Sequence, residues 1–180
     1  MRAVMLSARP YWCEKIVVRE KPLEVRKSRP KMQPPFKCYI YCTKVPKGWF
    51  WFDSPSIRRD GAVIGEFVCD SIRCFDVPYP AFQSEMDKQI LAESCLTYYQ
   101  LHRYAYHDAL YGWHISSLVI YNNPKELRNF RKPCMYELCC ESCGMYSEYA
   151  NSCGNAALEL TRPPQSWCYV EELEGGEGNG

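Results

Sequence analysis

Short β-prone segments recur along the whole chain, and this feature restricts its fold more than any other. These segments, rich in Val, Ile and Tyr, cover residues 4–7, 23–26, 38–43, 62–69, 118–121 and 166–170. Helical signals are fewer: one helix starts at Pro10, a second spans 98–105 behind a Thr97-x-x-Gln100 capping box, and a short one spans 125–130 after a turn at 122–124. The order contains no βαβ repeat. The sequence therefore predicts an α+β fold, a small mixed β-barrel with helices at its rim.

A length of 180 residues is typical of one domain. We expect the domain to cover residues 1–172, with a Cys-rich insertion at about 131–160, and the acidic, Gly-rich residues 173–180 to form a flexible tail. The apolar start of the chain is interrupted at Arg9 and Pro10, and no stretch approaches the roughly 18 apolar residues of a membrane helix. These features predict a cytoplasmic protein without membrane contact, and they leave its oligomeric state open.

The charges are unevenly distributed although their sum is only +1. Residues 1–60 contain fourteen Lys or Arg against five Asp or Glu, whereas the rest of the chain is acidic. A basic segment with aromatic neighbours can line a groove that attracts phosphates. A solvated charged surface is the alternative interpretation.

The segment Leu23-Glu24-Val25-Arg26 alternates apolar and charged residues. Successive side chains of a strand point to opposite faces, so Leu23 and Val25 are expected in the core. Glu24 and Arg26 would then share the other face.

The stretch that ends in this segment, Arg19-Glu20-Lys21-Pro22-Leu23-Glu24-Val25-Arg26, resembles the signature Gly-x-Lys-x-x-Glu-x-Arg of the activating-signal-cointegrator homology (ASCH) domains, which are PUA-like barrels. Lys21, Glu24 and Arg26 match, and Arg19 stands where the family has glycine. Supporting matches, in the family's order, are Ser7-x-x-Pro10-x-Trp12, Ile64-Gly65-Glu66, Gly112-Trp113-His114-Ile115 and Pro164-Gln165-Ser166-Trp167. The sequence is most similar to small stand-alone members from phages and from Gram-positive bacteria that carry them.

This resemblance implies a cleft that binds RNA or a modified nucleoside. Lys21 and Arg26 would hold a phosphate or carbonyl oxygen, and Glu24 would accept a hydrogen bond from a base amino group. Tryptophan side chains could stack on the base. The ligand-binding residues predicted in this way are Ser7, Lys21, Glu24, Arg26, Trp113 and Trp167, with Trp12 as a further stacking candidate. A plain ion pair of Glu24 with Arg26 on the barrel wall is the alternative.

One branch of the family resembles an amidohydrolase that removes the acyl group from acetylcytidine. That branch uses the motif lysine, a threonine at the position of Glu24, and a distant glutamate. Here Lys21 and Glu24 would be the catalytic residues, since a desolvated lysine beside a carboxylate can activate water or stabilise an oxyanion. Glu66 is the candidate for the remaining acid. A protein-interaction module is the third possibility.

The sequence contains twelve cysteines, which in a reducing compartment favour buried thiols or a metal site over disulfides. Cys140-x-x-Cys143 has the spacing of a zinc knuckle, and Cys134 with Cys153 would complete a structural four-thiolate zinc site. Cys139 is the alternative to Cys140. An iron–sulfur cluster, unliganded thiols in an insertion and a redox-active pair are the other interpretations.

Overall fold

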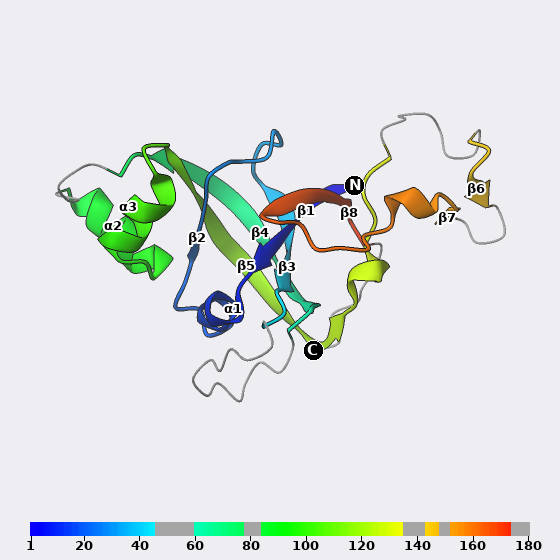
Figure 1. Cartoon of the computed structure of the whole chain (residues 1–180), viewed down its shortest axis with the longest axis horizontal. Helices are drawn as coiled ribbons and strands as arrows, with labels where there is room; N and C mark the ends of the chain where they lie inside the picture. The colour runs from blue at the N-terminus through cyan, green and yellow to red at the C-terminus, as the bar shows by residue number, and fades with distance from the viewer. Residues whose placement is uncertain (46–59, 78–83, 135–142, 148–151, 174–180) are drawn as a thin grey trace.

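The computed structural model describes residues 1–45, 60–77, 84–134, 143–147 and 152–173 (Figure 1). The strands are β1 (Arg2–Ala8), β2 (Leu23–Arg26), β3 (Phe36–Cys42), β4 (Ala62–Phe75), β5 (Leu110–Lys125), β6 (Tyr146–Ser147), β7 (Ser152–Cys153) and β8 (Trp167–Glu171). The helices are α1 (Pro10–Val17), α2 (Glu85–Ser94) and α3 (Tyr98–Ala105), with 3-10 turns at η1 (Leu127–Asn129) and η3 (Ala156–Leu158). The mixed α+β class expected from the sequence is confirmed.

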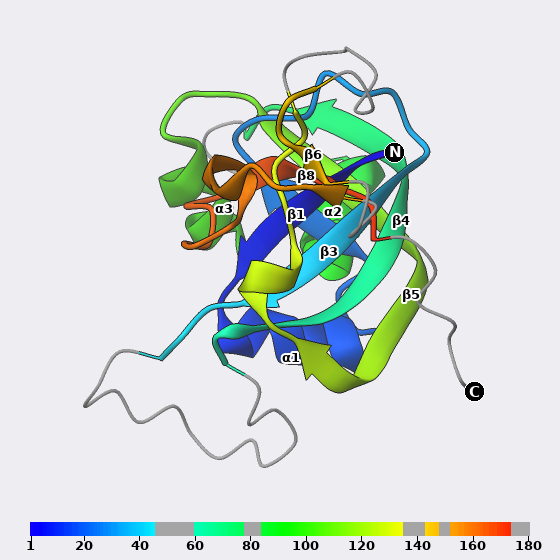
Figure 2. The same ribbon diagram turned by 90° about the vertical axis from the view of Figure 1, so that its right-hand side faces the viewer.

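Six strands form one curved sheet in the order β2-β5-β4-β3-β1-β8, with α1 packed at one end of it (Figure 2). β1 and β3 run parallel, and the other neighbouring strands of this sheet are antiparallel. β6 and β7 form a separate two-stranded sheet. Alternate residues of β1 enter different clusters of the core: Val4 and Leu6 pack with residues of α1, and Ala3 and Met5 pack with Phe130. Both faces of the sheet centre are therefore buried.

The sheet does not close into the expected barrel, because its edge strands β2 and β8 are not paired with each other. β2 has only four residues, and three prolines occur in the nine residues that connect it to β3. Proline has no N–H to donate, so this connection cannot extend the ladder. Side chains bridge the gap instead: Arg26 Nη1 donates to the Ser166 carbonyl at 3.2 Å, and Trp167 Nε1 donates to Ser28 Oγ at 3.0 Å.

β4 and β5 are longer than the sequence predicted, and the turn expected at residues 122–124 lies inside β5. The ladder pairs Val63 with Lys125 and Gly65 with Ile120, and the register shifts between these pairs. This irregularity accommodates Pro124, since an extra residue at a bulge leaves the ladder without needing an N–H donor. Pro124 and the two asparagines before it therefore mark a bulge and do not end the strand.

The helices begin where their caps predict. Pro10 is at the start of α1, and Thr97 and Gln100 form both bonds of the capping box of α3, as expected. α2 was not predicted, although Ser84 and Asp87 form the same kind of box at its start. Among the described residues no helix is long and apolar enough to cross a membrane.

Candidate functional site

The turn between α1 and β2 positions Lys21. Its backbone N–H and that of Glu20 both donate to the Lys15 carbonyl, at 3.0 and 2.9 Å, and so end the helix. Arg19, at the position of the family's glycine, has φ 60°. This left-handed conformation is the one for which glycine is favoured. The backbone therefore makes the turn that the glycine would make, with a larger residue.

β2 separates its side chains as the alternation predicted. Leu23 and Val25 pack in a buried cluster with residues of α2 and α3. Glu24 and Arg26 line a cavity on the other face, and Val25 also contributes atoms to its lining. Strand β2 pairs Glu24 with Trp113 of β5, so these two side chains leave the sheet on the same face.

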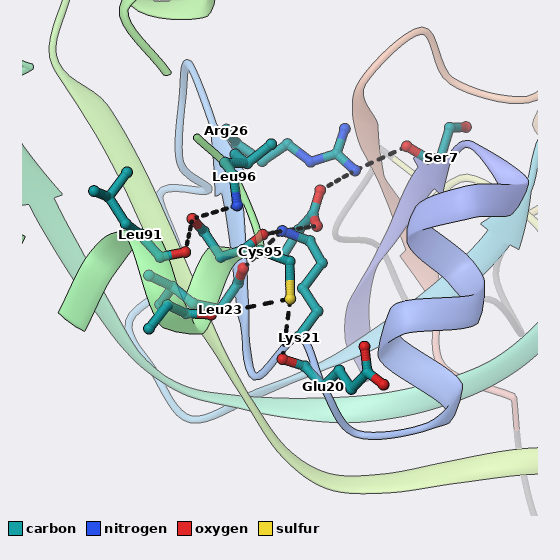
Figure 3. Close-up of polar contacts among 11 residues, drawn as sticks. Ser7, Glu20, Lys21, Leu23, Arg26, Leu91, Cys95 and Leu96 are labelled. Carbon is teal, nitrogen blue, oxygen red and sulfur yellow. Dashed lines mark hydrogen bonds and ion pairs between the residues drawn. The ribbon is translucent and has the colours of Figure 1, made fainter. Parts of the chain in front are cut away.

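Lys21, Glu24 and Arg26 form a buried ion network (Figure 3). Arg26 Nη2 lies 2.9 Å from Glu24 Oε1, and Lys21 Nζ lies 3.5 Å from Glu24 Oε2. The three residues are only 3%, 6% and 7% exposed. Charges buried to this extent must be paired or hydrogen-bonded to be stable.

Lys21 is held by the backbone as well as by Glu24. Its ammonium donates to the Ser94 carbonyl at 2.6 Å and to the Leu23 carbonyl at 3.0 Å, and it lies 5.2 Å from the centroid of the Trp12 ring. Burial lowers the pKa of Lys21 from its ordinary value, and the Glu24 carboxylate opposes this shift. The lysine is thus a positioned cation whose charged form is disfavoured by desolvation.

Arg26 connects β2 to two distant segments. Nη2 donates to the Ser7 carbonyl at 2.8 Å, and Nη1 donates to the Ser166 carbonyl and lies 3.4 Å from its hydroxyl. The Ser7 hydroxyl donates to the Pro164 carbonyl at 2.7 Å. Both terminal nitrogens of the Arg26 guanidinium are therefore already hydrogen-bonded to other residues of the protein.

The cavity beside this network has a volume of about 420 Å³, a size typical of small-molecule sites. Four of the predicted ligand-binding residues line it: Ser7, Lys21, Glu24 and Arg26. Trp12 of α1 and Tyr104 of α3 contribute aromatic rings, and the remaining residues of its lining are Ala8, Arg9, Val25, Thr43, Leu96, Gln100 and Gln165.

Two polar atoms of the lining residues have no hydrogen-bond partner among the described residues. Glu24 Oε2 is fully buried, and its nearest charged neighbour is the Lys21 ammonium at the outer limit of hydrogen-bond distance. Arg26 Nε is buried and unpartnered as well. A buried carboxylate oxygen without a donor is destabilising unless something supplies one.

Two predicted tryptophans do not line the cavity. Trp113 is fully buried in the core, with ring centroids 6.0 Å from Phe36 and 5.9 Å from Trp167. Trp167 is partly buried against that core and is bonded to Ser28. Sequence reasoning missed Tyr104 and Gln100, which lie four residues apart on one face of α3; their spacing was visible, but the orientation of that face was not.

Glu66 lies outside the cavity lining. Its carboxylate is 3.3 Å from Lys37 Nζ and accepts a hydrogen bond from the Tyr121 hydroxyl. The described structure therefore does not bring Glu66 together with Lys21 and Glu24.

The predicted zinc ligands are only partly described. Cys134, Cys143 and Cys153 are half-buried free thiols, whereas Cys139 and Cys140 lie outside the described residues. Within the described ranges no three His, Cys, Asp or Glu side chains are grouped to hold a metal. The four-thiolate site stays a prediction.

Comparison with known proteins identifies the fold. No family model matches the chain, and no curated protein matches its sequence. The crystal structure of ASCH from Zymomonas mobilis is 18% identical, with 94% of this chain and 88% of that chain covered and a TM-score of 0.58. Crystal structures of a tyrosine-to-phenylalanine and a serine-to-alanine variant of the Zymomonas mobilis protein are each 16% identical with TM-scores of 0.56, and cover 94% of this chain and 91% and 89% of their own. The chain therefore has the fold of the ASCH domain.

Proposed function

We propose that the cavity beside β2 binds a nucleobase, either in RNA or in a modified nucleoside. The observation that carries this proposal is the Glu24 carboxylate in the cavity lining, whose Oε2 accepts no hydrogen bond among the described residues and is paired only with the Lys21 ammonium, 3.5 Å away. A carboxylate only accepts hydrogen bonds, so the group that satisfies it must be a donor. The amino group of cytosine, adenine or guanine is such a donor.

The surrounding side chains support a flat, polar ligand. Trp12 and Tyr104 offer rings for stacking on a base, and the amides of Gln100 and Gln165 offer both donors and acceptors. The exposed Arg9 at the same cavity can pair with a phosphate or sugar oxygen. The ASCH fold itself agrees with a nucleic-acid ligand.

Calorimetric titration with cytidine and with N4,N4-dimethylcytidine tests the role of Glu24. Cytidine should bind, and the dimethyl compound, which lacks the amino N–H, should bind at least about tenfold more weakly because the carboxylate oxygen then stays unsatisfied. Glu24→Gln should lose a similar factor for cytidine. The matched control is Glu85→Gln, which removes an exposed carboxylate of α2 and should bind like the wild type.

A folded Tyr104→Ala variant keeps the test decisive if Glu24→Gln fails to fold. Tyr104 is 38% exposed, so its loss should weaken binding through stacking while the melting temperature changes little. Absence of binding for cytidine, adenosine and guanosine alike, in a folded wild-type protein, would reject the nucleobase proposal. The protein-interaction module would then be the better description.

A second candidate is an amidohydrolase acting on acylated cytidine-type nucleosides. It is favoured by the buried Lys21, whose pKa is lowered by desolvation and whose ammonium lies 3.5 Å from a carboxylate at the cavity. Such a lysine can stabilise the oxyanion formed when water attacks the amide. Incubation with acetylcytidine should release cytidine and acetate, and Lys21→Met should abolish this release. Lack of turnover by the wild type leaves binding as the function.

A further inference from the structure

Two buried thiols form a pair in the core cluster that includes residues of α1, β3 and β4. The cysteines of this cluster are Cys13, Cys38, Cys42 and Cys69, and each of them is fully buried. Cys13 of α1 donates a hydrogen bond to the thiol of Cys42, at the end of β3. Both are free thiols. The pair therefore connects the helix to the sheet by a contact between two sulfur atoms.

The backbone holds these two residues together. Ala8 pairs with Cys42 in the parallel ladder of β1 and β3. The Ala8 carbonyl accepts a hydrogen bond from the Thr43 N–H at 2.9 Å, and Cys13 Sγ lies 3.6 Å from the same oxygen. A disulfide requires Cβ atoms about 3.5–4.5 Å apart. Thiols that are already hydrogen-bonded can reach this separation by a small adjustment of their side chains.

The hydrogen bond makes the two thiols chemically unequal. Donation by Cys13 lowers the pKa of Cys42, whereas the same bond and burial raise the pKa of Cys13. Burial also raises the pKa of Cys38, and it raises that of Cys69 to about 12. The thiolate is the nucleophilic form of cysteine. Cys42 is therefore the thiol of this cluster that should react first, and Cys13 is in contact with it.

The neighbours of the pair in sequence reach two cavities. Trp12, next to Cys13, and Thr43, next to Cys42, line the cavity beside β2. Tyr41 and Thr43 line a second cavity, with a volume of about 330 Å³. A molecule as small as hydrogen peroxide that enters either cavity is thus separated from a thiol by one residue.

We propose that Cys13 and Cys42 are a redox modification site, at which a hydroperoxide converts the two thiols into a disulfide. The Cys42 thiolate attacks the peroxide and gains one oxygen as a sulfenic acid; the O–O bond breaks, and the departing hydroxide becomes water with the proton that Cys42 had released. The Cys13 sulfur then attacks the Cys42 sulfur. The S–S bond forms, the S–O bond breaks, and a second water leaves with the Cys13 proton. Two thiols lose two electrons, and one hydrogen peroxide becomes two waters.

This disulfide would fasten α1 covalently to the end of β3. The helix contributes Trp12 to the cavity beside β2 and ends in the turn that positions Lys21. The inference goes beyond the proposed function and does not depend on it, because the oxidation is measured without a nucleoside.

Peptide mapping of the folded wild type tests the proposal. Reduced protein is treated with about a tenfold excess of hydrogen peroxide, its remaining thiols are alkylated, and it is digested. Trypsin leaves Cys38 and Cys42 on one peptide, residues 38–44, and chymotrypsin separates them by cleavage after Tyr41. Mass spectrometry should find Cys13 linked to Cys42, and dithiothreitol should remove the link. The melting temperature should rise by about 5–10 °C on oxidation, because the cross-link restricts the unfolded chain.

Three variants separate the roles of the thiols. Cys13→Ser keeps a hydrogen-bond donor beside Cys42 but cannot form the disulfide, so dimedone, which labels sulfenic acids, should label Cys42 in this variant. Cys42→Ser should leave Cys13 unlabelled and should show no oxidative rise in melting temperature. The matched control is Cys69→Ser, which removes another fully buried thiol of the cluster and should still form the link.

Three outcomes would overturn the inference: no link between Cys13 and Cys42 in the oxidised wild type, a link from Cys13 to Cys38 in its place, or a link that forms only in urea. Mapping of the wild type decides between these outcomes even where a serine variant does not fold.

Discussion

At the scale of single residues, the turn before β2 shows how a departure from the family's motif is accommodated. Arg19 has φ 60°, a conformation that costs a residue with a Cβ roughly 1–2 kcal/mol relative to right-handed backbone. Its guanidinium is 3.4 Å from the Leu118 carbonyl at an exposed position, a weak contact that offsets little of this cost. The turn is needed all the same, because it delivers Lys21 to the cavity.

Replacing Arg19 by glycine should stabilise the protein. The substitution removes the backbone strain of the folded state. Glycine also gives the unfolded chain more conformational entropy, which cancels part of this stabilisation, so the free energy of unfolding should rise by about 0.5–1 kcal/mol. Urea denaturation measures this difference. Arg19→Ala is the control, because it removes the guanidinium and keeps the Cβ. Equal stability of the glycine and alanine variants would contradict the strain argument.

At the scale of elements, the pairing of β4 with β5 depends on a close approach at Gly65. A Cβ built there would lie 2.4 Å from the Val119 carbonyl oxygen and 3.2 Å from Ile120 Cα. Both are backbone atoms of β5 and cannot rotate away. Only glycine therefore fits the irregular register between these strands.

Gly65→Ala should lower the free energy of unfolding by about 2–4 kcal/mol, because the two longest strands must separate locally. Gly144→Ala is the control, since a Cβ at Gly144 meets nothing within 4 Å and should change stability little. Thermal or urea unfolding of the two variants makes the comparison. A Gly65→Ala protein as stable as the control would show that β5 can shift without loss.

The Cys-rich insertion is the second element that can be tested. Wild-type protein purified without chelator should contain about one zinc per chain, held by four thiolates. Cys143→Ser should lower this content, whereas Cys74→Ser, which alters an exposed thiol of β4, should not. Elemental analysis by mass spectrometry measures the metal. A wild-type content well below one would leave these thiols unliganded.

At the scale of the whole molecule, side chains join the two edges of the open sheet. Arg26 is the central link, because one guanidinium contacts the carbonyls of Ser7 and Ser166 as well as Glu24. Arg26 thus lines the cavity and also connects strand β2 to the segments at Ser7 and Ser166. Its buried position makes each lost bond expensive, since water cannot replace the arginine donors there.

Arg26→Met should lower the free energy of unfolding by about 3–5 kcal/mol, because it leaves Glu24 as a buried charge with one cation fewer. Amide hydrogen exchange should accelerate at β2 and β8 before it does at β3. Ser28→Ala is the control: it breaks only the exposed bond to Trp167 and should cost about 0.5–1.5 kcal/mol. Unchanged exchange at both edge strands in Arg26→Met would contradict this role.

Local rules in the sequence determined which charged side chains β2 contributes to the cavity. Glu24 and Arg26 share a face because a strand repeats every two residues, and Thr97 and Gln100 start a helix because a capping box is formed by neighbours. The α+β class and the Lys21 motif follow from such short-range patterns. The fold class and the motif can be predicted from the sequence because every interaction involved spans only a few residues.

Only the tertiary structure decided which groups are open to a ligand. Arg26 is hydrogen-bonded to Ser166, 140 residues away, and Trp113 is buried although it was predicted as a ligand-binding residue. The open sheet likewise depends on how β2 and β8 meet. These outcomes depend on contacts between distant segments, whose donors and volumes no local pattern specifies, and they leave Glu24 Oε2 as the buried acceptor at the cavity.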